Sequence, residues 1–119
     1  MNPDTEFEAE LMRGAALFNA GRYFAAHEAW EQIWRGAAGA NRTIVQGLIQ
    51  SAAAMLHRER GNPRGAARLL SKARGKLAHA PETWRGLAIG EFRGALDRYF
   101  DRSGDRVGAA PRPILRRGG

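Results

Sequence analysis

The chain has 119 residues, of which 19 are Lys or Arg and 12 are Asp or Glu, so its formal net charge is +7 and its isoelectric point lies near 11.2. It contains no cysteine, which excludes disulfides, thiolate zinc sites, iron–sulfur clusters and cysteine nucleophiles. A chain of this length can bury one core without such cross-links.

The hydropathy pattern argues against export and against a membrane span. The first residues are acidic, with Glu6, Glu8 and Glu10, where a secretory leader has a basic patch followed by an apolar run. The most apolar stretch, residues 43–56, is interrupted by glutamines and is shorter than the roughly 18 to 20 apolar residues that cross a bilayer. We therefore expect a soluble, cytoplasmic protein with no membrane partner.

The composition is typical of an all-α protein, because Ala, Leu, Arg and Glu are frequent while Val, Ile and Thr are rare. Apolar periodicity predicts five helices, over residues 4–19, 23–35, 41–60, 63–78 and 89–101. The expected N-caps are Asp4 or Thr5, Asn41 and Asn62, the last followed by a first-turn proline. No strand-like alternation is present.

The domain organisation follows from composition and from an internal repeat. Residues 1–101 are expected to form one helical domain, and residues 102–119, rich in Gly, Pro and Arg, a flexible basic tail. When the chain is aligned with itself at one offset, three residue pairs match, which are Gly21 with Gly61, Ala26 with Ala66 and Trp30 with Leu70. This internal repeat indicates two stacked helix-turn-helix units with the close packing of tetratricopeptide hairpins, within a compact all-α bundle.

Polar side chains interrupt the apolar faces of the second and third predicted helices. His27 and Glu31 lie one turn apart inside the apolar arc of residues 23–35, so they should be at least half-buried and within reach of each other. The helix over residues 41–60 carries a separate polar stripe. If the two helices are neighbours, one interior cluster results, made of His27, Glu28, Glu31, Trp34, Gln46, Gln50 and His57.

One interpretation of this cluster is structural, with Gln46 and Gln50 satisfying the carboxylates and ring nitrogens in a buried hydrogen-bond network. Another is a cleft between Trp30, Trp34 and Glu31 that binds an uncharged or cationic small ligand.

The third interpretation is a metal-dependent hydrolase. In it His27, Glu31 and His57 bind a divalent metal and Glu28 acts as general base. The spacing lacks the second histidine of a zincin helix and differs from the Glu-x-x-His of di-iron bundles. We therefore favour the hydrogen-bond network over a metal site and expect no cofactor.

Positive charge concentrates in the middle of the chain. Four cations recur at every fourth position of the helix over residues 63–78, which are Arg64, Arg68, Lys72 and Lys76. Like charges at this spacing repel one another, so an acidic partner would relieve them. The candidates are an acidic protein, nucleic acid, and the acidic first turn of the first helix, in the same molecule or in a second copy. No aromatic residue lies among these cations, so any binding of nucleic acid would be non-specific and sensitive to salt.

Three segments carry a family resemblance. Residues 18–34 contain the His27-Glu28 pair and Glu31, residues 46–54 contain Gln46 and Gln50, and residues 61–66 follow. Together they closely resemble the small bacterial and archaeal family called domain of unknown function 309, over about residues 18–77. The resemblance implies a compact all-helical domain and marks these five polar residues as characteristic of the family. It implies no reaction.

The sequence therefore predicts a cytoplasmic helical binding or interaction module rather than an enzyme. Its polar cluster organises a cleft, and its basic helix attracts an acidic partner. The alternatives are the metal-dependent hydrolase and non-specific nucleic-acid binding. Aromatic residues on the first and fifth helices favour a homodimer.

Overall fold

The computed structural model describes residues 2–101 and 111–118. Contacts divide the chain into two compact units, unit 1 (Met1–His79) and unit 2 (Ala80–Gly119). The boundary lies at the His79-Ala80-Pro81 sequence, where proline disfavours a continued helix. The sequence predicted one domain over residues 1–101, and the division arises because the segment after Ala80 makes most of its contacts within itself.

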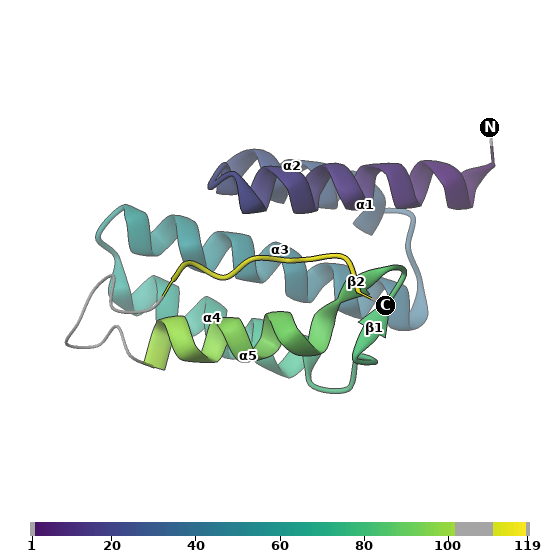
Figure 1. The fold of residues 1–119 in the computed structure, drawn as a ribbon. Coiled ribbons are helices and arrows are strands. Elements are labelled where there is room, and N and C mark those ends of the chain that lie inside the picture. The colour runs from purple at the N-terminus through teal and green to yellow at the C-terminus, as the bar shows by residue number, and fades with distance from the viewer. Residues whose placement is uncertain (1, 102–110, 119) are drawn as a thin grey trace. The chain divides into compact units, whose positions relative to one another are not determined.

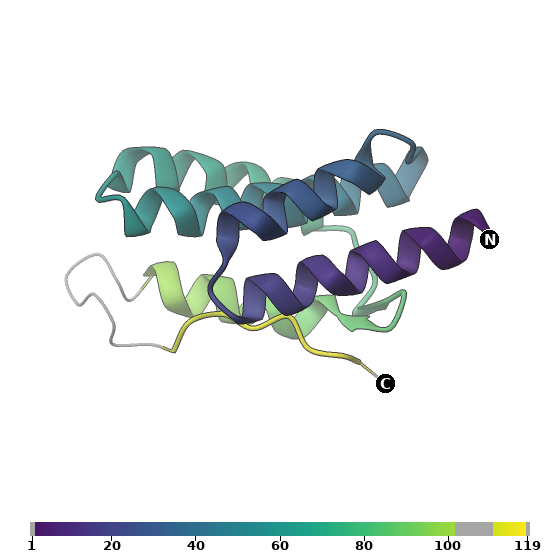
Figure 2. The ribbon, with the colours of Figure 1, turned by 90° about the horizontal axis from the view of Figure 1, so that it is seen from above.

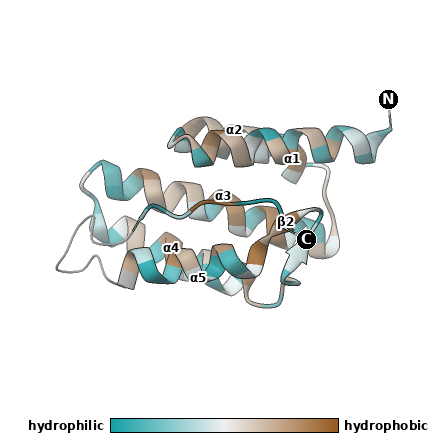
Figure 3. Cartoon of the chain, viewed as in Figure 1, coloured by the Kyte–Doolittle hydropathy of each residue, from teal (hydrophilic) through white to brown (hydrophobic). Residues whose placement is uncertain are grey.

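Unit 1 is a bundle of four helices, which are α1 (Pro3–Asn19), α2 (Tyr23–Trp34), α3 (Gly39–Glu59) and α4 (Pro63–Leu77). Each helix packs on the next one along the chain, and consecutive helices run in opposite directions (Figures 1 and 2). Each helix carries both hydrophobic and hydrophilic residues, as Figure 3 shows. The predicted all-α bundle of helix-turn-helix pairs is confirmed.

The two glycines at the turns of the internal repeat have the same backbone conformation in the structure. Gly21 and Gly61 both end a helix with positive φ angles of 80° and 73°, a conformation that glycine adopts without strain. Asn62 caps α4 as predicted, since its side chain accepts a hydrogen bond from the Gly65 backbone at 3.1 Å. The small residues after the turns, Ala26 and Ala66, are buried.

Two helix starts differ from the prediction. Asn2 caps α1 by accepting from the Asp4 backbone at 2.9 Å, because a proline at the first helical position leaves the cap one residue before it. The helix α3 begins at Gly39 after Ala38, which provides no side-chain cap, so the expected Asn41 cap is wrong.

Unit 2 opens with a hairpin that the sequence did not predict. Strands β1 (Thr83–Trp84) and β2 (Leu87–Ala88) pair antiparallel and lead into α5 (Ile89–Asp101), whose range matches the prediction. Arg85 and Gly86 form the turn with φ angles of 48° and 81°, and positive φ at both central residues is the geometry of a type I′ turn. Strands of two residues are too short to show alternation, so no pattern revealed them.

Residues 111–118 return along α5 to β2 (Figure 1), where the sequence predicted a flexible tail. The backbone N–H of Ala88 donates to the carbonyl oxygen of Arg116 at 2.8 Å, and the backbone N–H of Gly118 donates to the carbonyl oxygen of Gly86 at 2.9 Å. Leu115 is 2% exposed and Pro113 is also buried, so these two side chains anchor a segment whose other residues are exposed or partly exposed. The remainder of the predicted tail, residues 102–110, lies outside the described residues.

The exposed apolar surface differs from the expected one. Phe18 of α1 and Phe92 of α5, among the aromatic residues expected to favour a homodimer, are buried. Phe24, expected on the apolar arc of α2, is 55% exposed and stacks on His27 with ring centroids 6.4 Å apart. Across residues 2–101 and 111–118, no helix combines the length and apolar character needed to cross a membrane.

Candidate functional site

A pocket of about 230 Å³ lies in unit 1 among α2, α3 and α4. We call it the α2–α3 pocket, and its lining residues are His27, Glu31, Trp34, Gln46, Ile49, Gln50, Ala53 and Leu69. The spacing of these residues explains why they meet. His27, Glu31 and Trp34 are four and three residues apart, so they share one face of α2. Gln46, Gln50 and Ala53 have the same spacing and share one face of α3. The structure thus brings together five residues of the predicted cluster.

His27 and Glu31 form the polar rim of the α2–α3 pocket. His27 Nε2 lies 3.5 Å from Glu31 Oε1, and their side chains are 28% and 38% exposed, so both are more than half-buried. The second oxygen of Glu31 lies 3.9 Å from Arg35 Nη2. At these distances and exposures the carboxylate is only loosely engaged, and it stays available as a hydrogen-bond acceptor at the rim.

Two buried polar atoms of the lining residues have no hydrogen-bond partner within the described chain. They are the indole nitrogen Nε1 of Trp34, which can only donate, and the amide oxygen Oε1 of Gln50, which can only accept. More than nine-tenths of buried polar groups in native proteins are paired. A donor and an acceptor beside the same pocket thus have no partner among the described residues.

Arg42, which the sequence analysis did not single out, holds the Trp34 indole in position. Its guanidinium lies 3.8 Å from the ring centroid, and its Nη1 donates to the carbonyl oxygens of Trp34 at 3.2 Å and Ala37 at 3.4 Å. Stacking and hydrogen bonding together fix the ring at the C-terminus of α2. Its spacing from Trp34 crosses a loop, so helical periodicity could not reveal the contact.

Two members of the predicted cluster lie elsewhere. Glu28 is exposed, because a residue next to His27 on a helix points about 100° away from it. His57 lies at the turn between α3 and α4, where Asn62 Nδ2 donates to its Nδ1 at 2.9 Å. Both residues are absent from the pocket lining.

The proposed metal triad of His27, Glu31 and His57 is therefore not assembled. Within the part of the chain that the structure describes, no three His, Asp or Glu side chains approach closely enough to hold a metal ion. His27 and Glu31 lie on α2, whereas His57 lies about two turns beyond Gln50 along α3, and a helical wheel does not represent such a displacement along the axis.

Trp30, the other tryptophan of the predicted cleft, belongs to the core. It is 0% exposed, and its Nε1 donates to the Leu11 carbonyl at 3.1 Å. The cleft is instead completed by two apolar side chains, Ile49 and Leu69. No polar signal marks such residues in a sequence.

The basic helix α4 presents three of its four predicted cations to solvent. Arg64, Arg68 and Lys72 are exposed and make no ion pair with any described residue. Lys76 is partly covered, because the start of its side chain lies against Gly47 of α3. The exposed face, defined by Arg64, Arg68 and Lys72, is called the α4 basic face below.

Comparison with known proteins agrees with this architecture. The family model described as domain of unknown function (DUF309) matches residues 11–69, a range that includes seven of the lining residues of the α2–α3 pocket and Leu69 at its end. An uncharacterized protein of Aquifex aeolicus (strain VF5) is 33% identical over 95 residues. That match covers 78% of this chain and 28% of the relative, so the chain spans less than a third of the relative's length. The chain belongs to the DUF309 family.

Proposed function

We propose that unit 1 is a ligand-binding module of the cytoplasm whose α2–α3 pocket takes a small neutral molecule with adjacent hydrogen-bond donor and acceptor groups. The observation that carries this proposal is the unpaired pair of buried atoms, Trp34 Nε1 and Gln50 Oε1. Leaving such an atom unpaired costs about 1–3 kcal/mol. A carboxamide would satisfy both atoms, because its oxygen accepts from the indole and its N–H donates to the glutamine.

The shape and lining of the pocket support a small, partly apolar ligand. The volume of about 230 Å³ is below the range typical of drug-sized ligands. Ile49, Ala53 and Leu69 provide apolar contacts, and Glu31 offers a further acceptor at the rim. A flat aromatic amide combines the required donor, acceptor and apolar surface.

Titration with benzamide, followed by nuclear magnetic resonance of the indole N–H groups, tests this proposal. The chain has three tryptophans, and only the Trp34 signal is expected to move as benzamide saturates the pocket. Trp30 is an internal control, because its indole already donates to Leu11. Equal movement of all the indole signals, or no saturable movement at Trp34, would contradict the proposal.

Replacing Gln50 with methionine is expected to stabilise the ligand-free protein by about 1 kcal/mol, because it removes a buried acceptor that has no partner and keeps the side-chain size. The same change is expected to weaken benzamide binding. Chemical denaturation measures the free energy of unfolding, and the indole titration measures binding.

The matched control is Gln32→Met on the exposed face of α2, which is expected to change the free energy of unfolding by less than about 0.5 kcal/mol. Destabilisation by Gln50→Met would indicate that the amide is satisfied within the protein and would support the structural network instead.

A second function is supported by the exposure of the α4 basic face, whose three cations have no acidic partner among the described residues. We propose that this face attracts an acidic macromolecule. Because the attraction is electrostatic, binding should fall steeply as salt is raised and should not depend on sequence.

Reversing the charge of Arg64, Arg68 and Lys72 to glutamate tests the α4 basic face, with a short RNA duplex as probe. The triple variant is expected to lose binding at low salt, and single variants should each reduce the slope of log affinity against log salt by about 1. RNA binding that persists in the triple variant would exclude this face. Arg35→Glu on α2 controls for the general change in charge.

A further inference from the structure

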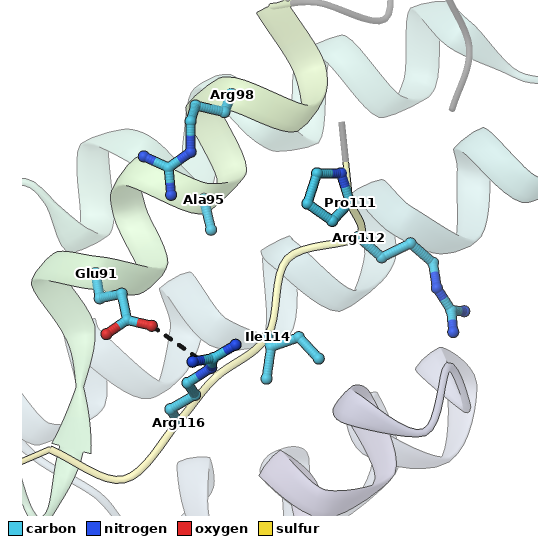
Figure 4. A pocket seen from close by; sticks show the side chains of 7 residues that line it. All are labelled: Glu91, Ala95, Arg98, Pro111, Arg112, Ile114 and Arg116. Carbon is cyan, nitrogen blue, oxygen red and sulfur yellow. Dashed lines mark ion pairs between the residues drawn. The ribbon is translucent and has the colours of Figure 1, made fainter. Parts of the chain in front are cut away.

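Unit 2 has a pocket of its own, between α5 and the segment that follows Pro111 (Figure 4). Its volume is about 360 Å³. The side chains of Ala95 and Ile114 form apolar walls, and the charged lining consists of Glu91, Arg98, Arg112 and Arg116. We call it the α5 pocket. The family match ends at residue 69 and does not include these residues.

The charges of the α5 pocket are unbalanced and loosely paired. Arg116 Nε lies 3.6 Å from Glu91 Oε1, and these side chains are 69% and 54% exposed, so the ion pair is weak. Arg98 and Arg112 make no ion pair with a described residue. The lining of the α5 pocket therefore carries three guanidinium groups and one carboxylate.

The orientation of the side chains selects two of the three arginines. In Figure 4, Arg98 extends from α5 on the side of Glu91, and the Arg116 guanidinium points toward Glu91 beside Ile114. The guanidinium of Arg112 points away from these two. Arg98 and Arg116 thus line the α5 pocket from two elements of unit 2, next to the apolar wall.

We propose that the α5 pocket binds a small organic phosphate monoester. The planar fork of a guanidinium donates two parallel hydrogen bonds that match phosphate oxygens, and a doubly charged phosphate suits two such forks better than a single carboxylate does. The organic part of the ester would contact Ala95 and Ile114. Glu91 competes with the phosphate for Arg116, so this carboxylate limits the affinity.

The test is a titration of the full chain with phenyl phosphate, followed by the backbone and arginine Nε–H signals. Saturable shifts at Arg98 and Arg116 are expected. Inorganic phosphate, which lacks the apolar part, should bind the same residues more weakly. Benzyl alcohol, which lacks the phosphate, should not shift them.

The variants give effects of opposite sign. Arg98→Gln and Arg116→Gln are each expected to weaken phenyl phosphate binding about tenfold, because each loses a charge-assisted hydrogen bond. Glu91→Gln is expected to strengthen it about threefold by releasing Arg116. Arg60→Gln and Glu59→Gln, at exposed positions of unit 1 outside the α4 basic face, make the same changes of net charge and should leave the affinity unchanged.

The outcomes separate a formed site from general attraction to a basic protein. Shifts spread over α4 and α5 alike, or equal losses for Arg98→Gln and Arg60→Gln, would overturn the proposal. Weaker binding by Glu91→Gln would do so too. Arg98→Lys keeps the charge but loses the fork, so retained affinity in this variant would contradict recognition by guanidinium geometry. Unchanged signals of Leu96 and Leu115, which are buried in unit 2, verify in each variant that this unit is folded.

Discussion

Gly14→Ala is expected to lower the free energy of unfolding by about 3 kcal/mol, near the upper end for overpacking in a core. A methyl group at Gly14 would overlap the indole ring of Trp30, which is 0% exposed. The ring cannot move freely, because its Nε1 donates to the Leu11 carbonyl at 3.1 Å on the same helix, α1. The substitution must therefore separate α1 from α2 or break this hydrogen bond. Chemical denaturation monitored by tryptophan fluorescence measures the loss.

Gly75→Ala is the matched control for Gly14→Ala. Gly75 lies inside α4, and a Cβ at this position would meet no atom within 4 Å. The change is therefore expected to stabilise the protein by about 0.5–1 kcal/mol, because alanine loses less backbone entropy than glycine in a helix. Similar effects of the two substitutions would show that helix propensity, and not contact with Trp30, determines the role of Gly14.

Gly47→Ala is expected to lower the free energy of unfolding by about 2 kcal/mol, because a Cβ at Gly47 would lie 2.7 Å from the Cγ and Cδ2 atoms of Leu77. Leu77→Ala, at a fully buried position, should cost about 3 kcal/mol. In the double variant the new methyl group occupies space vacated by the leucine. The combined loss should therefore be smaller than the sum by about 1 kcal/mol.

The same double-mutant cycle links packing to the proposed function. Gly47 lies between Gln46 and Gln50 in the chain, and its lack of a side chain lets α4 approach α3. Leu69 of α4 lines the α2–α3 pocket, so the wider helix spacing in Gly47→Ala should weaken benzamide binding. Restored binding in the double variant is the expected result. Additive losses of stability together with unchanged binding would show that this contact does not shape the pocket.

Local periodicity was sufficient to find most of the α2–α3 pocket. His27 and Glu31 share a face of α2, and Gln46 and Gln50 share a face of α3, because residues four apart on a helix are neighbours whatever surrounds them. His57 also lies on the face of Gln50, but seven residues correspond to about 10 Å along a helix axis. The angular pattern therefore placed it correctly around α3 and incorrectly along it.

Other parts of the sites depend on contacts between segments that carry no shared pattern. Arg42 stacks on Trp34 across a loop, and Leu69 reaches the pocket only through the packing of α4. In unit 2, Arg116 meets Glu91 because two buried residues, Pro113 and Leu115, anchor the segment. A few apolar residues among Gly, Pro and Arg resemble a disordered tail in composition, although they are enough to place a short segment.

The sequence by itself determined that this protein is helical, where four of its turns and breaks fall, and which polar residues share a helical face, because all of these depend on interactions within a few residues. Tertiary structure alone decided which residues of neighbouring helices lie at the same position along the helix axes. It also left the Trp34 donor and the Gln50 acceptor buried without a partner among the described residues, and it brought Arg98 and Arg116 to one pocket. The physical reason is that packing at close-approach positions such as Gly14 and Gly47 sets how the helices slide along one another, and helical periodicity contains no information about that displacement.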